Sequence, residues 1–204
     1  MEKKVGDPLS QTEDDLWVED ETTARVGTII KKVLAPQGTR PVIRVIVGKY
    51  TKRINVFISL SRTGRVVVTI VVGLDAAATK KHLLEVRKVN GPGTIRMLWD
   101  GSGAHHAASV KQYCTTKDIK LDYFPTHSPE TNPVEEINRQ LKKFLATQLF
   151  WTVQDLKKAV KKFFEERGYH FDLSIEEYIC SQACKTITSQ EEVQEGSSPH
   201  IDPS

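Results

Sequence analysis

The sequence predicts an α/β domain in which a mixed sheet is flanked by helices. Runs of Val and Ile separated by turn residues fill the first third of the chain, a pattern typical of an antiparallel meander. Short apolar runs alternate with helical periodicity in the rest, which indicates parallel strands joined by crossover helices. The length of 204 residues, 39% of them hydrophobic and 27% charged, is enough for one domain with tails but not for two full-sized domains.

The predicted meander begins with a short β-prone run, Leu16–Val18, which ends in the acids Glu19, Asp20 and Glu21. Four further strands are predicted from their Val and Ile content: Thr28–Leu34, Val42–Val47, Asn55–Leu60 and Val66–Val72. Turn residues separate them, namely Gly38, Gly48-Lys49 and Thr63-Gly64.

The period changes after Gly73. Asp75 is placed to cap a helix that runs from Ala76 to about Val89, where Asn90-Gly91-Pro92-Gly93 ends it. The elements expected next are a strand at Ile95–Trp99, a helix at Ala104–Cys114, a strand at Ile119–Phe124, a loop at Pro125–Pro133, and amphipathic helices at Val134–Leu149 and Val153–Arg167. An antiparallel meander joined to parallel strands is the ribonuclease-H-like arrangement.

Charge is distributed unevenly along the chain. Residues 1–21 hold eight carboxylates and two lysines, and residues 189–204 hold four carboxylates and no Lys or Arg. The body, residues 22–188, therefore carries 27 cations and 14 anions, a net charge of +13. Such a body is expected of a polyanion binder, although a solvated Lys and Arg surface has the same composition, and charge alone does not decide between them.

Several classes of protein are excluded by composition. The longest apolar run, Val66–Leu74, is too short to span a bilayer, and the first ten residues contain no apolar segment that resembles a signal peptide. Three cysteines, an odd number, do not make a disulfide framework. We therefore expect that the protein is neither secreted nor inserted into a membrane, and that it is located in the cytoplasm.

Three carboxylates are predicted to form a site. Asp20 is expected to close the first strand, Asp100 closes the strand Ile95–Trp99, and Glu135 lies in the first turn of the helix after the Pro-rich loop. Clustered carboxylates repel one another unless a cation joins them, and hard ions such as Mg²⁺ prefer oxygen ligands. Two such ions about 4 Å apart would serve phosphodiester chemistry. The alternative is that these acids are ordinary surface residues at strand ends.

Three local blocks resemble the catalytic blocks of DDE transposases of the mariner-type superfamily and the related prokaryotic insertion-sequence transposases. They are Leu16-Trp17-Val18-Glu19-Asp20-Glu21, Trp99-Asp100-Gly101-Ser102-Gly103-Ala104-His105, and the most specific one, Ser128-Pro129-Glu130-Thr131-Asn132-Pro133-Val134-Glu135. The 34 residues between Asp100 and Glu135 match the interval that the family uses. The sequence departs from the family pattern at Gly101, Gly103, His127 and Asn138.

The resemblance implies a fold, an activity and partners. The fold is a ribonuclease-H-like mixed five-stranded sheet flanked by helices. The activity is metal-dependent cleavage and strand transfer of double-stranded DNA during transposition, with Asp20, Asp100 and Glu135 as catalytic residues that bind two Mg²⁺ (or Mn²⁺) ions. Only about fifteen residues precede the first catalytic strand, so the helix-turn-helix modules that bind transposon ends are expected to be separate or missing. A homo-oligomer on DNA, in the nucleoid of a prokaryotic host, is also implied.

The resemblance divides the chain into four parts. Residues 14–168 form the catalytic domain, and residues 169–188 a C-terminal helical extension. Residues 1–13 and the acidic tail 189–204 are expected to be disordered, because they lack apolar periodicity. Two other functions remain open: a catalytically inactive transposase remnant that binds DNA non-specifically, and a different ribonuclease-H-like nuclease without strand transfer.

The remaining polar residues are weighed against simpler roles. Glu136 competes with Glu135 as the third acid, and helical geometry does not separate them; the family block selects Glu135. His105 fits the family's His position and either orients a metal ligand or touches a phosphate. His82 and His170 are read as packing or surface residues, and Cys180 and Cys184, spaced i and i+4, as a thiol pair on a helix rather than a metal site.

Lysine pairs recur along the predicted helices. They are Lys80-Lys81, Lys142-Lys143, Lys157-Lys158 and Lys161-Lys162. Such pairs are typical of solvated helix faces. In a transposase domain they would also contact DNA phosphates, which gives an affinity that depends on salt but not on base sequence.

Overall fold

The computed structural model describes residues 15–27, 36–39, 52–101, 105–125, 131–146 and 148–182. Within these residues, five strands form one sheet in the order β3-β2-β1-β4-β5. They are β1 (Asp15–Arg25), β2 (Arg53–Ser61), β3 (Val66–Val71), β4 (Ile95–Trp99) and β5 (Ile119–Tyr123). β2 pairs antiparallel with both β1 and β3, whereas β4 pairs in parallel with both β1 and β5. The predicted mixed sheet is confirmed.

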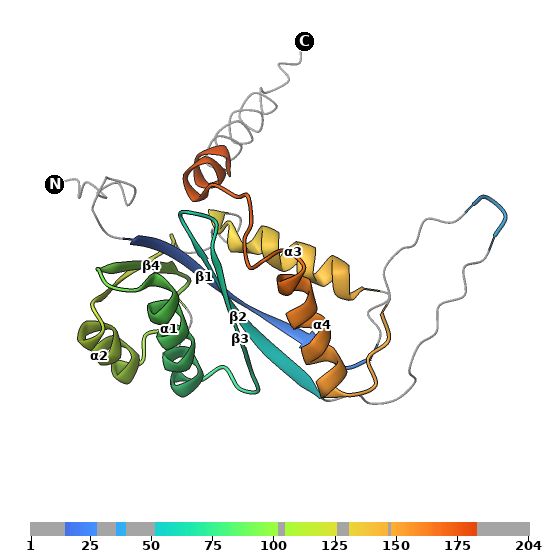
Figure 1. The fold of residues 1–204 in the computed structure, drawn as a ribbon, viewed down its shortest axis with the longest axis horizontal. Coiled ribbons are helices and arrows are strands. Elements are labelled where there is room, and N and C mark those ends of the chain that lie inside the picture. The colour runs from blue at the N-terminus through green and yellow to red at the C-terminus, as the bar shows by residue number, and fades with distance from the viewer. Residues whose placement is uncertain are drawn as a thin grey trace, which may run out of the picture.

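Helices cover both faces of the sheet (Figure 1). The helices α1 (Ala76–Asn90) and α2 (Ala108–Thr116) lie on one side, and α3 (Val134–Leu145) and α4 (Val153–Glu165) lie on the other. Local chemistry sets where they begin. The carboxylate of Asp75 accepts a hydrogen bond from the amide of Ala78 at 2.8 Å, and Thr152 and Asp155 form a reciprocal capping box at the start of α4.

The sheet therefore separates two apolar cores. Because side chains alternate along a strand, Leu16 and Val18 of β1 face the larger core with α3 and α4, whereas Trp17 faces the core with α1 and α2. This alternation continues into the acidic residues that follow. Asp20 shares the side of Leu16 and Val18, and its neighbours Glu19 and Glu21 share the side of Trp17.

The first strand is longer than predicted. We expected it to close at Asp20, but β1 continues to Arg25, because antiparallel pairing with β2 holds it as far as Arg25 opposite Arg53. Asp20 therefore lies within the strand. What ends near Asp20 is the pairing with β4, whose last partners are Val18 and Leu98.

Most other predicted elements are confirmed, with different bounds. α2 begins at Ala108 rather than Ala104, since residues 105 and 106 form a turn. α3 ends at Leu145, because Ala146 takes an extended conformation, and α4 ends at Glu165. The predicted strands Thr28–Leu34 and Val42–Val47 and both predicted disordered tails lie outside the described residues.

The C-terminal segment packs against the rest of the domain. Phe171 and Ile175 are buried in the larger core, and residues 175–182 are helical. The amide of Phe171 donates to the carbonyl of Gly64 at 2.9 Å. Gly64 has a φ of +82°, and a Cβ there would lie 2.4 Å from the carbonyl oxygen of Phe171, so this turn requires glycine. The predicted limits of the catalytic domain and its extension remain predictions.

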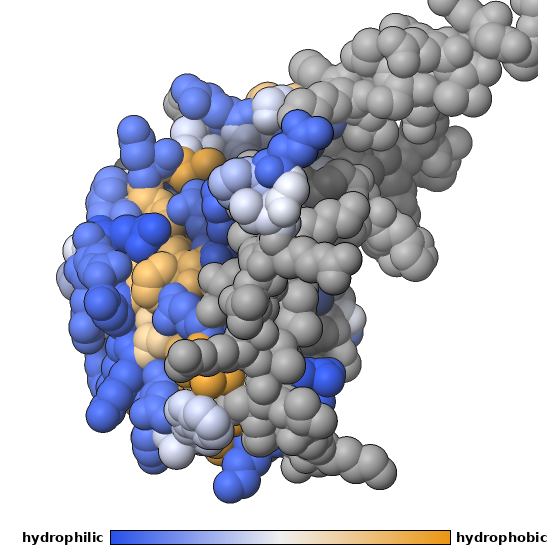
Figure 2. Space-filling view, turned by 90° about the vertical axis from the view of Figure 1, so that its right-hand side faces the viewer, coloured by the Kyte–Doolittle hydropathy of each residue, from blue (hydrophilic) through white to orange (hydrophobic). Residues whose placement is uncertain are grey.

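Polar and apolar residues both contribute to the surface of the described part. Figure 2 shows one face on which hydrophilic side chains predominate, with a band of apolar surface between them. No helix in the described ranges combines the length and the apolar character needed to cross a membrane.

Of the two roles predicted for His82, packing or surface, the structure shows the first, because its side chain is buried. Its Nε2 lies 2.8 Å from the hydroxyl of Ser59 and its Nδ1 lies 2.8 Å from the hydroxyl of Thr69. Burial, with a smaller effect of the charge of His105, lowers the pKa of His82 from 6.5 to about 3. The hydroxyl groups satisfy the neutral ring, but the protonated ring would lack the solvation that water gives it.

We predict that His82 lowers stability in acid. Below pH 6.5 the unfolded chain binds a proton at His82 that the folded chain does not, so the free energy of unfolding falls as the pH drops toward 3, by up to about 1.4 kcal/mol per pH unit. Denaturant unfolding between pH 4 and 7 should show a smaller pH slope for His82→Gln than for the wild type. The exposed His170→Gln serves as the control. An imidazole signal of His82 that titrates between pH 5 and 7 by NMR would contradict this.

Candidate functional site

The register between β1 and β4 brings two of the predicted acids together. The parallel ladder ends at Val18 opposite Leu98, and Asp20 and Asp100 each follow two residues later. Carboxylate oxygens of Asp20, Asp100 and Glu21 lie within 4.8 Å of one another. The predicted meeting of Asp20 and Asp100 thus occurs, although 79 residues separate them in the chain, and Glu21 joins them.

The third predicted acid, Glu135, approaches from α3. Asn132 sets where this helix begins: its Oδ1 accepts a hydrogen bond from the amide of Val134 at 2.9 Å, and its Nδ2 donates to the carbonyl of Glu19 in β1 at 3.0 Å. The first turn of α3 is thereby tied to the strand that carries Asp20. Glu135 is not among the oxygens within 4.8 Å, but its charge acts on Asp20.

Electrostatics make Asp20 an unusual carboxyl group. Burial raises its pKa from 3.8 to about 7, and the charge of Glu135 is the second cause, with smaller contributions from Glu21 and Asp100. The carboxylates are therefore too close for all of them to ionise comfortably at neutral pH. A divalent cation removes this conflict, and an all-oxygen donor set suits Mg²⁺ or Mn²⁺. The residues present fit a hard metal ion.

Glu136 is engaged elsewhere. Its carboxylate accepts two hydrogen bonds from the guanidinium of Arg139, both at 2.6 Å, and one from Gln140 at 2.9 Å. The bonds to Arg139 lower its pKa, whereas its partial burial acts in the opposite direction. This ion pair therefore satisfies Glu136 on its own helix. Glu135 is the acid of α3 whose charge raises the pKa of Asp20.

Asn138 is a functional candidate that sequence reasoning noted only as a departure from the family pattern. Its side chain is buried, and its Nδ2 donates a hydrogen bond to Oδ2 of Asp20. A signal was available in the sequence. Asn138 is a polar residue at i+3 from Glu135, beside the apolar stripe of Val134, Ile137 and Leu141.

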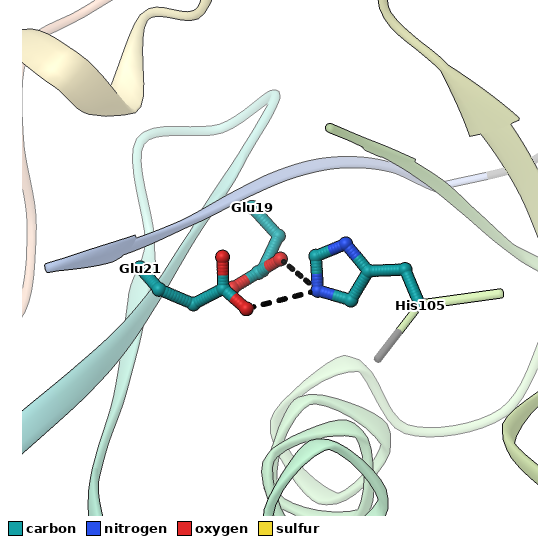
Figure 3. Close-up of side chains that lie close together, drawn as sticks. All are labelled: Glu19, Glu21 and His105. Carbon is teal, nitrogen blue, oxygen red and sulfur yellow. Dashed lines mark ion pairs between the residues drawn. The ribbon is translucent and has the colours of Figure 1, made fainter. Parts of the chain in front are cut away.

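A second cluster lies on the other side of β1, where Glu19, Glu21 and His105 converge (Figure 3). Nε2 of His105 lies 3.0 Å from Glu21 Oε1 and 3.4 Å from Glu19 Oε2, and its Nδ1 lies 2.9 Å from Asp100 Oδ1. We call Glu19, Glu21 and His105 the rear cluster. It is almost fully buried: the side chain of His105 is 0% exposed and that of Glu19 is 1% exposed.

Protonation in the rear cluster follows from its contacts. Burial disfavours the charged imidazole, but the close contacts with Asp100 and Glu21 and the charge of Glu19 outweigh it, which raises the pKa of His105 to about 10. Burial also raises the pKa of Glu19, chiefly by desolvation and then by repulsion from Glu21. The ring of His105 stacks on Trp99 with centroids 4.1 Å apart and planes within 1°.

The remaining residues singled out in the sequence either lie at the surface or fall outside the described residues. His170 is exposed, with Nε2 3.0 Å from the carbonyl oxygen of Thr63, and Cys180 is an exposed free thiol. Cys184 lies outside the described residues, so the predicted thiol pair remains a prediction. Residues 102–104 and 126–130 of the family blocks also lie outside them.

Comparison with known structures identifies the fold. The mariner Mos1 paired-end complex with Mg matches with a TM-score of 0.68 at 17% identity, covering 86% of this chain and 55% of that chain. The Mos1 strand transfer complex matches with a TM-score of 0.59 at 16% identity, covering 80% and 49%. The catalytic domain of Mos1 mariner transposase matches with a TM-score of 0.54 at 14% identity, covering 80% and 73%. The predicted ribonuclease-H-like fold is confirmed.

The extent of these matches is partial. The chain spans about half the length of the Mos1 chains in those DNA complexes. No curated protein sequence matches it. A family model described as DDE superfamily endonuclease matches residues 15–157, which is most of the chain. This range contains Asp20, Asp100 and Glu135. The chain therefore belongs to the DDE superfamily endonuclease family.

Proposed function

We propose that this chain is the catalytic domain of a DDE transposase, which cleaves DNA and transfers the cut strand in a reaction that depends on Mg²⁺ or Mn²⁺. The observation that carries the proposal is the meeting of Asp20 and Asp100, with oxygens within 4.8 Å, next to the helix that bears Glu135. Membership of the family and the likeness to transposase complexes with Mg and Mn support it.

The proposal assigns a role to each acid. Asp20, Asp100 and Glu135 hold the metal ions, and Asn138 keeps Oδ2 of Asp20 in place by donating a hydrogen bond to it. When bound, two divalent ions activate the attacking oxygen and stabilise the leaving oxygen of a phosphodiester. The attacking oxygen is that of water during cleavage and a 3′-hydroxyl of DNA during strand transfer.

DNA is the substrate that the charges near the site favour. Glu135, Arg139 and Lys142 follow one another at i, i+4 and i+7 on α3 and, together with Glu136 and Tyr178, line a pocket of about 320 Å³. Arg139 and Lys142 are placed to bind backbone phosphates of a DNA strand whose scissile bond lies at Asp20, Asp100 and Glu135. The helix-turn-helix portion and a homo-oligomer on DNA belong to the same proposal.

A metal titration tests the proposed function. Wild-type protein should cleave double-stranded DNA only with Mg²⁺ or Mn²⁺ and join a 3′-hydroxyl end to a target duplex, whereas Asp100→Asn should do neither. Cleavage without joining would favour a different nuclease. DNA binding with no cleavage at any metal concentration would favour the inactive remnant.

We predict that Asp20→Asn stabilises the metal-free protein. The pKa of Asp20 is higher in the folded than in the unfolded chain, so its ionisation destabilises the fold increasingly as the pH rises from about 4 through 7. The gain at pH 8 is expected to be roughly 1–3 kcal/mol, because one unit of pKa difference corresponds to about 1.4 kcal/mol.

Thermal unfolding in EDTA at pH 5 and pH 8 measures this effect, with the exposed Asp172→Asn as the control. The gain should be larger at pH 8, and added Mg²⁺ should raise the melting temperature of the wild type only. Equal melting temperatures for wild type and Asp20→Asn at pH 8 would contradict the repulsion on which the metal site rests.

We predict different outcomes at the two neighbouring acids of α3. Glu135→Gln should abolish metal-dependent cleavage, since the amide keeps the shape but loses the negative charge that a Mg²⁺ site needs. Glu136→Gln should reduce cleavage only a few-fold, because that residue pairs with Arg139. Parallel cleavage assays and unfolding curves measure both, and stability should change by less than about 0.5 kcal/mol at Glu136. The reverse ranking would move the third acid to Glu136.

We predict that the chain binds DNA without sequence preference and with a steep salt dependence. The net charge of +13 in residues 22–188 supplies the phosphate contacts. Fluorescence anisotropy with duplexes of unrelated sequence should give equal affinities, and Lys142→Gln should lower the slope against log salt by about 1. Lys111→Gln on α2 is the matched control. Selective binding of one sequence would place recognition within this chain.

A further inference from the structure

The rear cluster explains how Asp100 is held. Asp100 lies one residue beyond the end of β4, and half of its side chain is exposed. The side chain of His105 contacts it twice from behind, with Nδ1 2.9 Å from Oδ1 and 3.1 Å from the backbone carbonyl oxygen of the same residue. A ring that grips both the carboxylate and the backbone restricts the rotation of the Asp100 side chain.

His105 is itself fixed on every side. Its flat face lies on Trp99, the residue before Asp100, with the two planes parallel to within 1°. Its far nitrogen, Nε2, points at two carboxylates of β1, Glu21 at 3.0 Å and Glu19 at 3.4 Å (Figure 3). Carboxylates therefore flank the ring at both ends, Glu19 and Glu21 near Nε2 and Asp100 near Nδ1, although Nε2 makes no well-aligned hydrogen bond among the described residues.

The acids of β1 also project from both faces of the strand and have different partners on each face. Asp20 projects toward α3, where Asn138 holds it, whereas Glu19 and Glu21 project to the opposite face and hold His105. Both oxygens of Glu19 lack a hydrogen-bond partner among the described residues, and the side chain is buried. A buried carboxylate of this kind is costly without a cation beside it. Nε2 of His105, 3.4 Å from Glu19 Oε2, is the nitrogen that lies against this carboxylate.

We propose that His105 is a positioning residue, which orients Asp100 for metal binding and is locked in place by Glu19 and Glu21. This inference rests on the proposed function, because it assumes that Asp100 is a metal ligand. His105 acts on the ion through Asp100, the proposed metal ligand that its Nδ1 contacts. Groups that orient a metal ligand in this way commonly change metal affinity by about 10–100-fold when they are removed.

Substitutions at His105 separate orientation from mere packing. His105→Ala removes both contacts. His105→Asn retains a donor near the position of Nδ1, which faces Asp100, but does not reach Glu19 and Glu21. Glu19→Gln keeps the shape behind the ring and removes one charge. His106→Ala is the matched control, since this neighbour is exposed and its ring stacks on Tyr123.

Mn²⁺ affinity, measured by calorimetry on the full chain, is the readout, with unfolding curves measured beside it. His105→Ala is expected to weaken Mn²⁺ binding by at least 10-fold, His105→Asn to recover most of that loss, Glu19→Gln to weaken binding by a few-fold, and His106→Ala to leave it unchanged. Rescue of affinity by His105→Asn without rescue of stability marks orientation, because a packing role would move both together. If His105→Ala does not fold, Glu19→Gln and His105→Asn carry the test.

Two outcomes overturn the proposal in different ways. If Asp20→Asn and Glu135→Gln weaken Mn²⁺ binding while His105→Ala binds like the wild type, the positioning role is wrong and the proposed function stands. If the wild type itself binds no Mn²⁺, the metal-dependent function fails and the positioning role fails with it.

Discussion

The parallel register of β1 and β4 is the constraint on which the rest of the site depends. Val18 pairs with Leu98, and every later residue of the two strands inherits that alignment, so Asp20 and Asp100 come to the same level of the sheet. A slip of one residue would turn one of the two carboxylates to the opposite face, because side chains alternate along a strand. The apolar residues that specify this register, Leu16, Trp17 and Val18, are therefore as important to the site as the acids themselves.

The carboxylates of the site repel one another, and other interactions must offset this repulsion. Burial and the neighbouring carboxylates, Glu21 among them, raise the pKa of Asp20 to about 7, and the rear cluster brings a further acid, Glu19, close to Glu21. Opposing groups offset part of this cost: Asn138 donates to Asp20, and the charged ring of His105 lies between Glu19, Glu21 and Asp100. Hydrophobic packing supplies the rest, since large side chains next to the acids, such as Trp17 and Trp99, are fully buried in the core with α1 and α2.

Sequence reasoning reached the order of strands and helices because each has a local signal. Periodicity found Ile95–Trp99, and Asp75 marked the start of α1. The length of β1 was missed, because Glu19, Asp20 and Glu21 look like the end of a strand, and only pairing with β2 shows that the strand continues. Asp20, Asp100 and Glu135 were selected by family blocks. The family blocks also pointed to His105, but the contacts of His105 with Glu19 and of Asn138 with Asp20 were not predicted, because they span 86 and 118 residues and no local pattern encodes them.

One strand thus serves two purposes through its period of two. On one face of β1, Asp20 meets Asn138 and the field of Glu135, and on the other, Glu19 and Glu21 hold His105. Asp100 links the two faces, because its oxygens lie near Asp20 and also against Nδ1 of His105. A substitution on either face of β1 is therefore expected to affect the carboxylate of Asp100. This arrangement explains why three consecutive acids, of which Glu19 is fully buried, are tolerated in one strand: Asp20 has Asn138 as its partner, Glu19 and Glu21 share His105, and the strand separates the two sets.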